Sequence, residues 1–136
     1  MKINAKQIGF SKPFNVKPSL KIWMKTNQMT IKSLKLNVLE VKSDSIAPTD
    51  PNYADKMLEI VEAEQKIAEE AVQYLAEVFK LNEKQIDHME ESITNARQLS
   101  NYVTYVAQRV QGMSDEQIRL ANKKQAEKQK SEDPKK

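Results

Sequence analysis

Apolar residues recur at helical spacing most clearly between residues 50 and 80. They fall on one broad face, opposite a face rich in glutamate. Asp50 is a good N-cap residue, and Pro51 suits the first helical position, where its missing N–H costs nothing. The pattern therefore predicts a helix over residues 50–80. Its apolar positions are Tyr53, Met57, Ile60, Val61, Ile67, Ala68, Ala71, Val72, Leu75, Val78 and Phe79.

Shorter helices are predicted after residue 80. Asn82 and Gln85 have the spacing of a capping box, which opens a helix. The apolar repeat then changes phase near residue 94, which indicates a break. The following helix is expected to stop at Gly112, because glycine favours the left-handed conformation that ends helices.

A last helix is predicted after this glycine. Ser114 and Gln117 repeat the capping-box spacing and open a helix that runs through Ala121. Beyond Asn122 no apolar stripe remains. Residues 122–136 are therefore expected to form a disordered, lysine-rich tail.

The first fifty residues permit two interpretations. Prolines and aromatic residues indicate extended chain to about residue 18. From Leu20 to Val41, apolar residues recur at threes, fours and one doubled step, with Asn27 as the lone polar member, and this indicates a helix. Residues 34–38 also alternate apolar and polar side chains, as a strand does, but we prefer the helix. The apolar positions are Leu20, Trp23, Ile31, Leu34, Val38 and Val41.

Together these elements predict a mainly α fold. We expect a small helical domain of four to five helices, preceded by an extended or short β segment and followed by a disordered tail. Residues 1–49 form the basic N-terminal segment, residues 50–121 the helical core and residues 122–136 the tail. A length of 136 residues suits a single domain.

Composition excludes several classes of protein. Two glycines cannot supply the usual phosphate-binding or nucleophile-elbow motifs, and the absence of cysteine excludes disulfides and thiolate metal sites. His88 is the one histidine, and a metal site needs three or four converging ligands. We therefore expect no catalytic residues, no metal and no cofactor. Apolar runs are too short for a signal peptide or a membrane span, which predicts a cytoplasmic protein.

Charge divides the chain into three parts. Residues 1–52 hold nine lysines against three acids, a net charge of +6, and residues 53–121 hold seven basic and thirteen acidic side chains, a net charge of −6. The last fifteen residues carry six lysines against three acids, or +3. Such a division suits nucleic-acid binding and head-to-tail association between copies alike.

Three features mark candidate protein-binding surfaces. Glu64 interrupts the apolar face of the helix over 50–80, either as a rim carboxylate paired with a lysine or arginine or as a register-setting charge in a subunit interface. Tyr105 lies one turn from Arg109 with Asn101 nearby, a combination typical of binding hot spots, although single exposed aromatics are equally common. Trp23 stands among lysines, where it could stack on single-stranded nucleic acid, but a tryptophan at helical spacing is more often core.

Two stretches carry a resemblance to a known family. Tyr102–Ile118 resembles the C-terminal part of tail assembly chaperones from siphophages and prophages of Gram-positive bacteria, and Leu81–Ile86 resembles their short interhelical turn. The likeness lies in the helical pattern, the terminating glycine and the capped last helix. It implies a small helical protein that coats the tape-measure protein before the tail tube polymerises, and that keeps the hydrophobic helices of this partner soluble.

The resemblance also implies partners and a location. They are the tape-measure protein and the tail tube protein, in the host cell cytoplasm, with the chaperone absent from the mature virion. We expect a homo-oligomer as well. Two other classes stay open from the residues alone: a small basic nucleic-acid-binding or regulatory protein, and a structural connector of the virion. The acidic middle and the scarcity of arginine in the basic ends disfavour nucleic acid.

Overall fold

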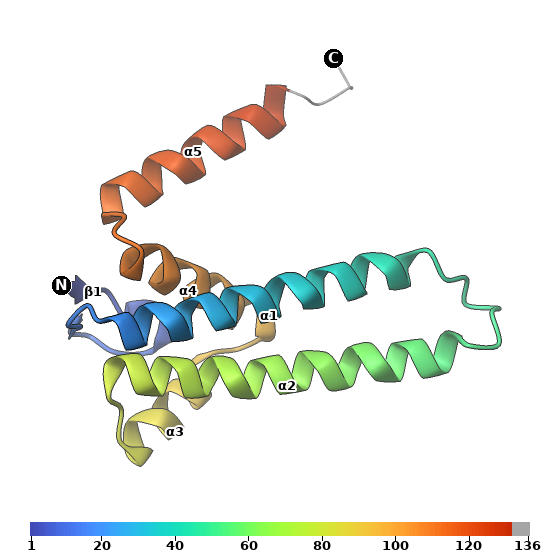
Figure 1. Ribbon diagram of the computed structural model, residues 1–136, viewed down its shortest axis with the longest axis horizontal. Helices are drawn as coiled ribbons and strands as arrows, with labels where there is room; N and C mark the ends of the chain where they lie inside the picture. Colours follow the sequence, from blue (N-terminus) through green and yellow to red (C-terminus); the bar gives the residue numbers. More distant parts are fainter. Residues whose placement is uncertain (132–136) are drawn as a thin grey trace.

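The computed structural model describes residues 1–131 and is mainly helical (Figure 1). Two short strands form one antiparallel pair, with Lys2 opposite Asn15 and Ile3 opposite Phe14. The elements in chain order are β1 (Lys2–Ile3), the 3-10 turn η1 (Lys6–Ile8), β2 (Phe14–Asn15), α1 (Leu20–Asp44), α2 (Tyr53–Phe79), α3 (Glu83–Ser92), α4 (Ala96–Val110) and α5 (Asp115–Ser131).

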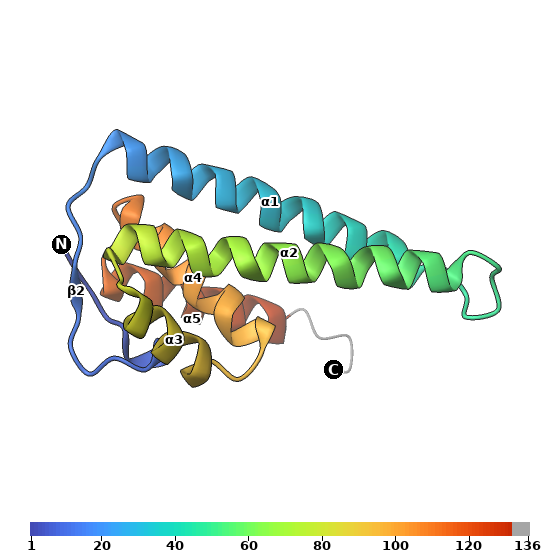
Figure 2. The ribbon, with the colours of Figure 1, turned by 90° about the horizontal axis from the view of Figure 1, so that it is seen from below.

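The two longest helices, α1 and α2, form an antiparallel hairpin that dominates the shape (Figures 1 and 2). α4 packs against both of them, and α3 packs against α2. All of these contacts, with the N-terminal segment, gather at the end where α1 begins, and the opposite end of the hairpin projects beyond them. We call residues 30–59 the hairpin tip and the remainder of residues 1–110 the body.

The hydrophobic core lies in the body. Tyr102 of α4 is fully buried at its centre and donates a hydrogen bond of 2.5 Å to the backbone oxygen of Asn4. The N-terminal segment is thereby fixed to α4. The core consists of Ile3, Ala5, Ile8, Val16, Met29, Ala71, Tyr74, Leu75, Val78, Phe79, Met89, Leu99, Tyr102, Val103 and Val106.

The helix ends predicted from capping signals after residue 80 are confirmed. Asn82 and Gln85 form the reciprocal capping box before α3. α3 ends at Ser92 and α4 begins at Ala96, on either side of the predicted break near residue 94. Gly112 follows α4 with a φ of 103°, in the left-handed region. Ser114 and Gln117 bond each other's backbone N–H groups at 3.1 and 2.9 Å, the second capping box.

Residues 20–44 are helical, as preferred, and not a strand. Ser19 caps this helix by accepting a hydrogen bond of 3.2 Å from the backbone N–H of Ile22. The predicted start of the next helix was three residues early. The Asp50 side chain accepts from the N–H of Asn52 at 2.8 Å and so stabilises a turn before the helix, which begins at Tyr53.

The last helix is longer than predicted. It was expected to end near Asn122 but continues to Ser131, because lysine, glutamine, alanine and glutamate all favour helix intrinsically. The absence of an apolar stripe is nonetheless visible: every residue from 119 to 130 is exposed. The rest of the expected tail, residues 132–136, lies outside the described residues.

Candidate functional site

α1 packs against the rest of the molecule with its less apolar face. This inner seam is mostly small or polar, and its members are buried or half-buried. The hydroxyls of Thr26 and Tyr74 are hydrogen-bonded at 2.7 Å, which satisfies two polar groups inside the body. The inner seam consists of Ile22, Thr26, Met29, Ser33, Leu36, Glu40 and Ser43.

Most of the apolar residues of α1 face outward. They lie almost opposite the inner seam, because a shift of two positions turns a helix by about 200°. Each of them is between 50% and 70% exposed. We call this set the outer stripe; it consists of Leu20, Met24, Ile31, Leu34, Val38 and Val41. So many exposed large apolar side chains on one helix mark a binding surface.

The outer stripe has the spacing of a coiled-coil seam. When the half-buried Asn27 is added to the outer stripe as a polar member, the positions from Leu20 to Val41 alternate in steps of four and three residues. A repeat averaging 3.5 residues keeps one seam facing a partner helix over several turns. A single polar residue within such a seam fixes the register of pairing at some cost in stability.

The two edges of the outer stripe differ in charge. The residues that directly follow Leu20, Leu34 and Val41 are lysines, and glutamine follows Asn27. This makes a lysine edge of Lys21, Gln28, Lys35 and Lys42. The residues that directly precede Met24, Ile31 and Val38 are uncharged and make the neutral edge of Trp23, Thr30 and Asn37.

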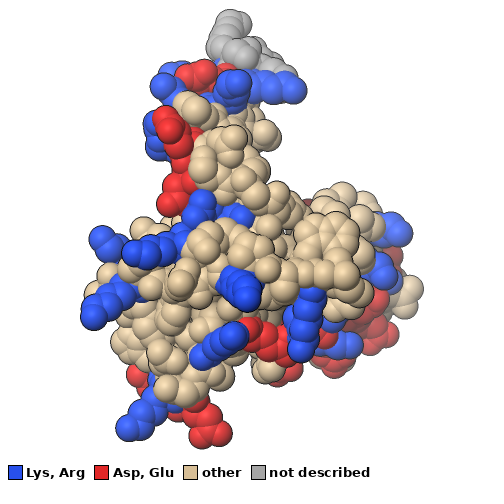
Figure 3. Space-filling model, turned by 60° about the vertical axis from the view of Figure 1, so that its left-hand side comes forward, with Lys and Arg blue, Asp and Glu red and all other residues tan. Residues whose placement is uncertain are grey.

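Lysines on the two sides of α1 differ in whether they form ion pairs within the molecule. Lys25 and Lys32, which face α2, form ion pairs with Glu77 and Glu70. In the described part of the chain, the three lysines of the lysine edge form no ion pair within 4.0 Å. Figure 3 looks at the end of the molecule where α1 begins and shows Lys and Arg side chains over a largely uncharged surface.

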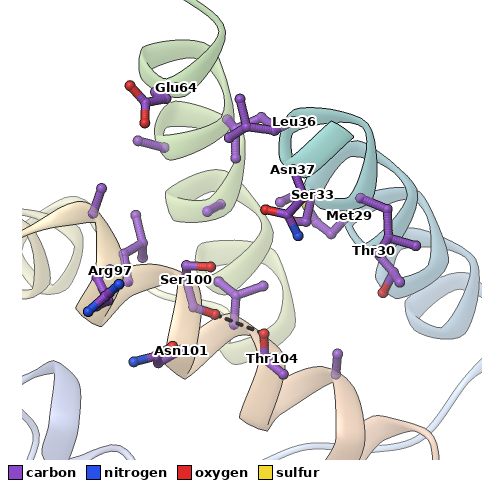
Figure 4. A pocket seen from close by; sticks show the side chains of 18 of the residues that line it. Met29, Thr30, Ser33, Leu36, Asn37, Glu64, Arg97, Ser100, Asn101 and Thr104 are labelled. Atoms are coloured by element: carbon purple, nitrogen blue, oxygen red, sulfur yellow. Dashed lines mark hydrogen bonds between the residues drawn. The ribbon is translucent and has the colours of Figure 1, made fainter. Parts of the chain in front are cut away.

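A groove of about 720 Å³ opens beside the neutral edge, between α1, α2 and α4. Figure 4 shows Ser33 and Asn37 of α1 facing Ser100 and Thr104 of α4 across it. Most of its lining is small or uncharged, and Leu34 belongs to both the groove and the outer stripe. The two surfaces are therefore continuous.

Acidic side chains meet at the far end of this groove. Burial raises the pKa of Glu40 above its ordinary value of 4.5, and a hydrogen bond and the negative charge of Glu64 raise this pKa further. Asp44 contributes in the same direction. Glu64 is thus half-buried between α1 and α2 beside another acid, and within residues 1–131 no lysine or arginine forms an ion pair with it, contrary to one of the two interpretations.

Tyr105 and Arg109 are engaged within the molecule, so the exposure expected for this pair is not found. The Tyr105 hydroxyl donates to Asp115 at 2.6 Å. Burial and this carboxylate raise the pKa of Tyr105. The Arg109 guanidinium donates to the backbone oxygens of Lys2 and Met113 at 2.7 and 3.2 Å and lies 3.3 Å from Asp115. Both residues join α4 to its neighbours in the fold.

The remaining candidates are accessible. Asn101 is exposed and lines the groove. Trp23 is 48% exposed on the neutral edge, so the expectation that it is core is wrong. His88 lies 2.7 Å from the backbone oxygen of Gly9 through its Nε2. In residues 1–131 no three His, Cys, Asp or Glu side chains are grouped as metal ligands would be.

Sequence reasoning found the apolar repeat of α1 but missed two parts of the surface. Met24 completes the alternation of fours and threes in place of Trp23. The lysine edge was readable as well, because Lys21, Lys35 and Lys42 sit at multiples of seven residues, each directly after a stripe residue.

One family model matches residues 1–129, and it describes phage tail assembly chaperone proteins, TAC. The chain belongs to the phage tail assembly chaperone family. Nothing in this match distinguishes Gram-positive siphophages from other sources. No curated protein and no solved structure matches the chain.

Membership of the family associates this tail assembly chaperone with tail proteins, and the outer stripe is the most extended exposed apolar surface of α1. Among the described residues, no helix combines the length and the apolar character that crossing a membrane requires.

Proposed function

We propose that this chaperone binds the tape-measure protein in the host cytoplasm through the outer stripe of α1. It keeps the helices of that protein soluble and holds them ready for the tail tube protein. The observation that carries the proposal is the orientation of α1, which leaves the six large apolar side chains of the outer stripe exposed to solvent from Leu20 to Val41. A monomer gains no stability from that arrangement, whereas a partner helix gains a long apolar seam.

The dimensions of the outer stripe suit a long partner. From Leu20 to Val41 it extends over about 32 Å at 1.5 Å per residue. An amphipathic helix aligned with it would cover these side chains and leave its own polar face in water. The charged residues around the stripe keep the free chaperone soluble until the partner is present.

Nucleic acid is a weaker candidate for this surface. The lysines of α1 lie beside the many glutamates of α2, two of which already form ion pairs with Lys25 and Lys32. A phosphate backbone would meet this acidic helix, and duplex binding needs a concentrated cationic face. The apolar stripe also has no role in such a complex.

The test is co-expression with the tape-measure protein encoded in the same tail gene cluster. Wild-type chaperone should raise its solubility and co-purify with it. Leu34→Ser/Val38→Ser removes the middle of the outer stripe and should abolish both effects. The proposal is wrong if wild type neither solubilises nor retains the tape-measure protein.

A matched control exists on α2. Leu58 and Val61 are 57% and 59% exposed, against 58% and 55% for Leu34 and Val38. The variant Leu58→Ser/Val61→Ser therefore removes the same residue types at the same exposure from outside the stripe. It should bind as wild type does. Equal loss in both double variants would show that general surface hydrophobicity, and not the stripe, is responsible.

A further inference from the structure

The lysine edge restricts which helices the outer stripe can bind. Lys21, Lys35 and Lys42 recur with a period of seven or a multiple of it, so they lie along one side of the seam. In a paired helix, the residues flanking the partner's own seam lie next to this edge. These flanking positions set partner choice and orientation in helix pairs.

Inside the molecule, two lysines of α1 form ion pairs with an acidic helix. Lys25 and Lys32 both meet glutamates of the helix that packs beside them. The lysine edge presents the same side chain on the solvent side. Within the described chain its lysines form no ion pair within 4.0 Å, although the hydrogen bond from Lys25 and the charge of Lys21 both help to lower the pKa of Glu77. An acidic helix would pair with it as α2 pairs with the other side of α1.

We propose that the outer stripe takes an acidic helix: one with an apolar repeat of 3.5 residues and with Asp or Glu along the side that faces Lys21, Lys35 and Lys42. This inference rests on the proposed function and names the chemistry of the segment bound. The neutral edge of Trp23, Thr30 and Asn37 places no charge requirement on the partner's other side.

Two other occupants fit this surface less well. A second copy that paired stripe to stripe in antiparallel orientation would oppose two lysine edges, and in parallel orientation it would place lysines against the neutral edge. An anionic membrane would attract the lysines, but a flat surface wide enough to reach them would also meet exposed Glu62 and Glu69 of the adjacent α2, whereas a single helix on the outer stripe covers α1 alone. Neither arrangement satisfies the lysine edge as an acidic helix does.

The experiment uses the full chain and designed peptides of four heptads. The peptides share one apolar seam, contain no tryptophan, and carry only glutamate, only glutamine or only lysine at the flanking positions. Trp23 is the single tryptophan, on the border of the stripe, so its fluorescence reports binding directly. The glutamate peptide should bind about tenfold more tightly than the lysine peptide, and added salt should reduce this ratio.

Charge reversal provides the decisive variant. Lys21→Glu/Lys35→Glu/Lys42→Glu should invert the preference, so that the lysine peptide binds more tightly. The control Lys12→Glu/Lys66→Glu/Lys84→Glu changes the net charge equally at exposed sites away from the stripe. It should keep the wild-type preference.

Each other outcome has a definite meaning. Equal binding of all peptides, or preference for lysine by the wild type, overturns the inference. Binding to phosphatidylglycerol vesicles with no binding to any peptide replaces the helix with a membrane. Self-association that Leu34→Ser/Val38→Ser abolishes, again without peptide binding, replaces it with a second copy.

The two proposals fail separately. Tape-measure binding that depends on Leu34 and Val38 but tolerates the triple reversal leaves the proposed function intact and overturns the acidic partner. Strong binding of the glutamate peptide without any effect on the tape-measure protein supports the acidic-helix surface and overturns the proposed function.

Discussion

The body and the hairpin tip are built from the same two helices but are stabilised differently. In the body, α1 and α2 pack with α3, α4 and the N-terminal segment around a core of fifteen buried residues. In the hairpin tip, Ser43 is the one buried residue between positions 30 and 59. The tip therefore gains little from burial, and its helices extend from the turns already fixed in the body.

This difference explains why apolar residues remain exposed on α1. A helix in the body is held by its core and can direct its other face to a partner without unfolding. In the tip the outer stripe continues over Ile31, Leu34, Val38 and Val41, so the least stabilised region carries much of the candidate binding surface. Partner binding and local folding are expected to be coupled there.

The largest contrast should appear in amide hydrogen exchange. Amides of α2 from Ala71 to Phe79 and of α4 should exchange only on global unfolding, whereas those of residues 30–59 should exchange through local opening of the hairpin tip. Exchange measured by mass spectrometry tests this, and a bound partner should slow exchange in the tip most. Equal protection of tip and body would contradict the comparison.

Two leucine substitutions compare the body and the hairpin tip by their effect on the free energy of unfolding. Leu75 is fully buried, so Leu75→Ala should lower the free energy of unfolding by about 2–5 kcal/mol. Leu34 is 58% exposed, and Leu34→Ala should change it by less than about 0.5 kcal/mol. Urea unfolding followed by circular dichroism measures both. A large loss for Leu34→Ala would mean that the outer stripe is covered in the free protein.

The smallest effect is expected from the acidic cluster between the helices. Burial, Glu64 and Asp44 raise the pKa of Glu40 above 4.5 in the folded state. The folded state therefore binds a proton more tightly than the unfolded chain, and this contribution to stability is lost as the pH rises through the raised pKa. Glu40→Gln should accordingly raise the melting temperature at pH 7, and the gain should vanish below the ordinary pKa of 4.5.

Thermal melts at several pH values measure this effect. Glu62→Gln, at an exposed position on α2, controls for the loss of one negative charge. A gain for Glu40→Gln that is the same at all pH values would show that titration of this carboxyl does not cause it.

Local signals in the sequence predicted the boundaries between α2, α3, α4 and α5 well, but not the start of α2 or the end of α5. Tertiary choices were harder to predict. The capping boxes at Asn82 and Ser114 depend on residues three positions apart, so sequence alone reveals them. α1 has two seams, and apolar content favours burial of the one with Leu34 and Val38. The body instead buries the other seam, where the hydroxyl of Thr26 is hydrogen-bonded to that of Tyr74 in α2.

The sequence predicted only part of the candidate site. Trp23 and Asn101 were identified and are accessible. The sequence pattern of Tyr105 and Arg109, one helical turn apart with Asn101 nearby, predicts an exposed binding surface. Their partners are Asp115 and the backbone of Lys2, ten and more than a hundred positions away, and only the folded chain brings these groups together.

Under the proposed function, the length of the outer stripe also sets a stoichiometry. A helix aligned with it is covered over about 22 of its own residues, because both helices rise 1.5 Å per residue. Copies placed end to end along one partner helix would therefore be spaced by at least this footprint. The number of chaperones bound should then grow in proportion to the helical length of the partner, so that a longer partner requires more copies at the same degree of coverage.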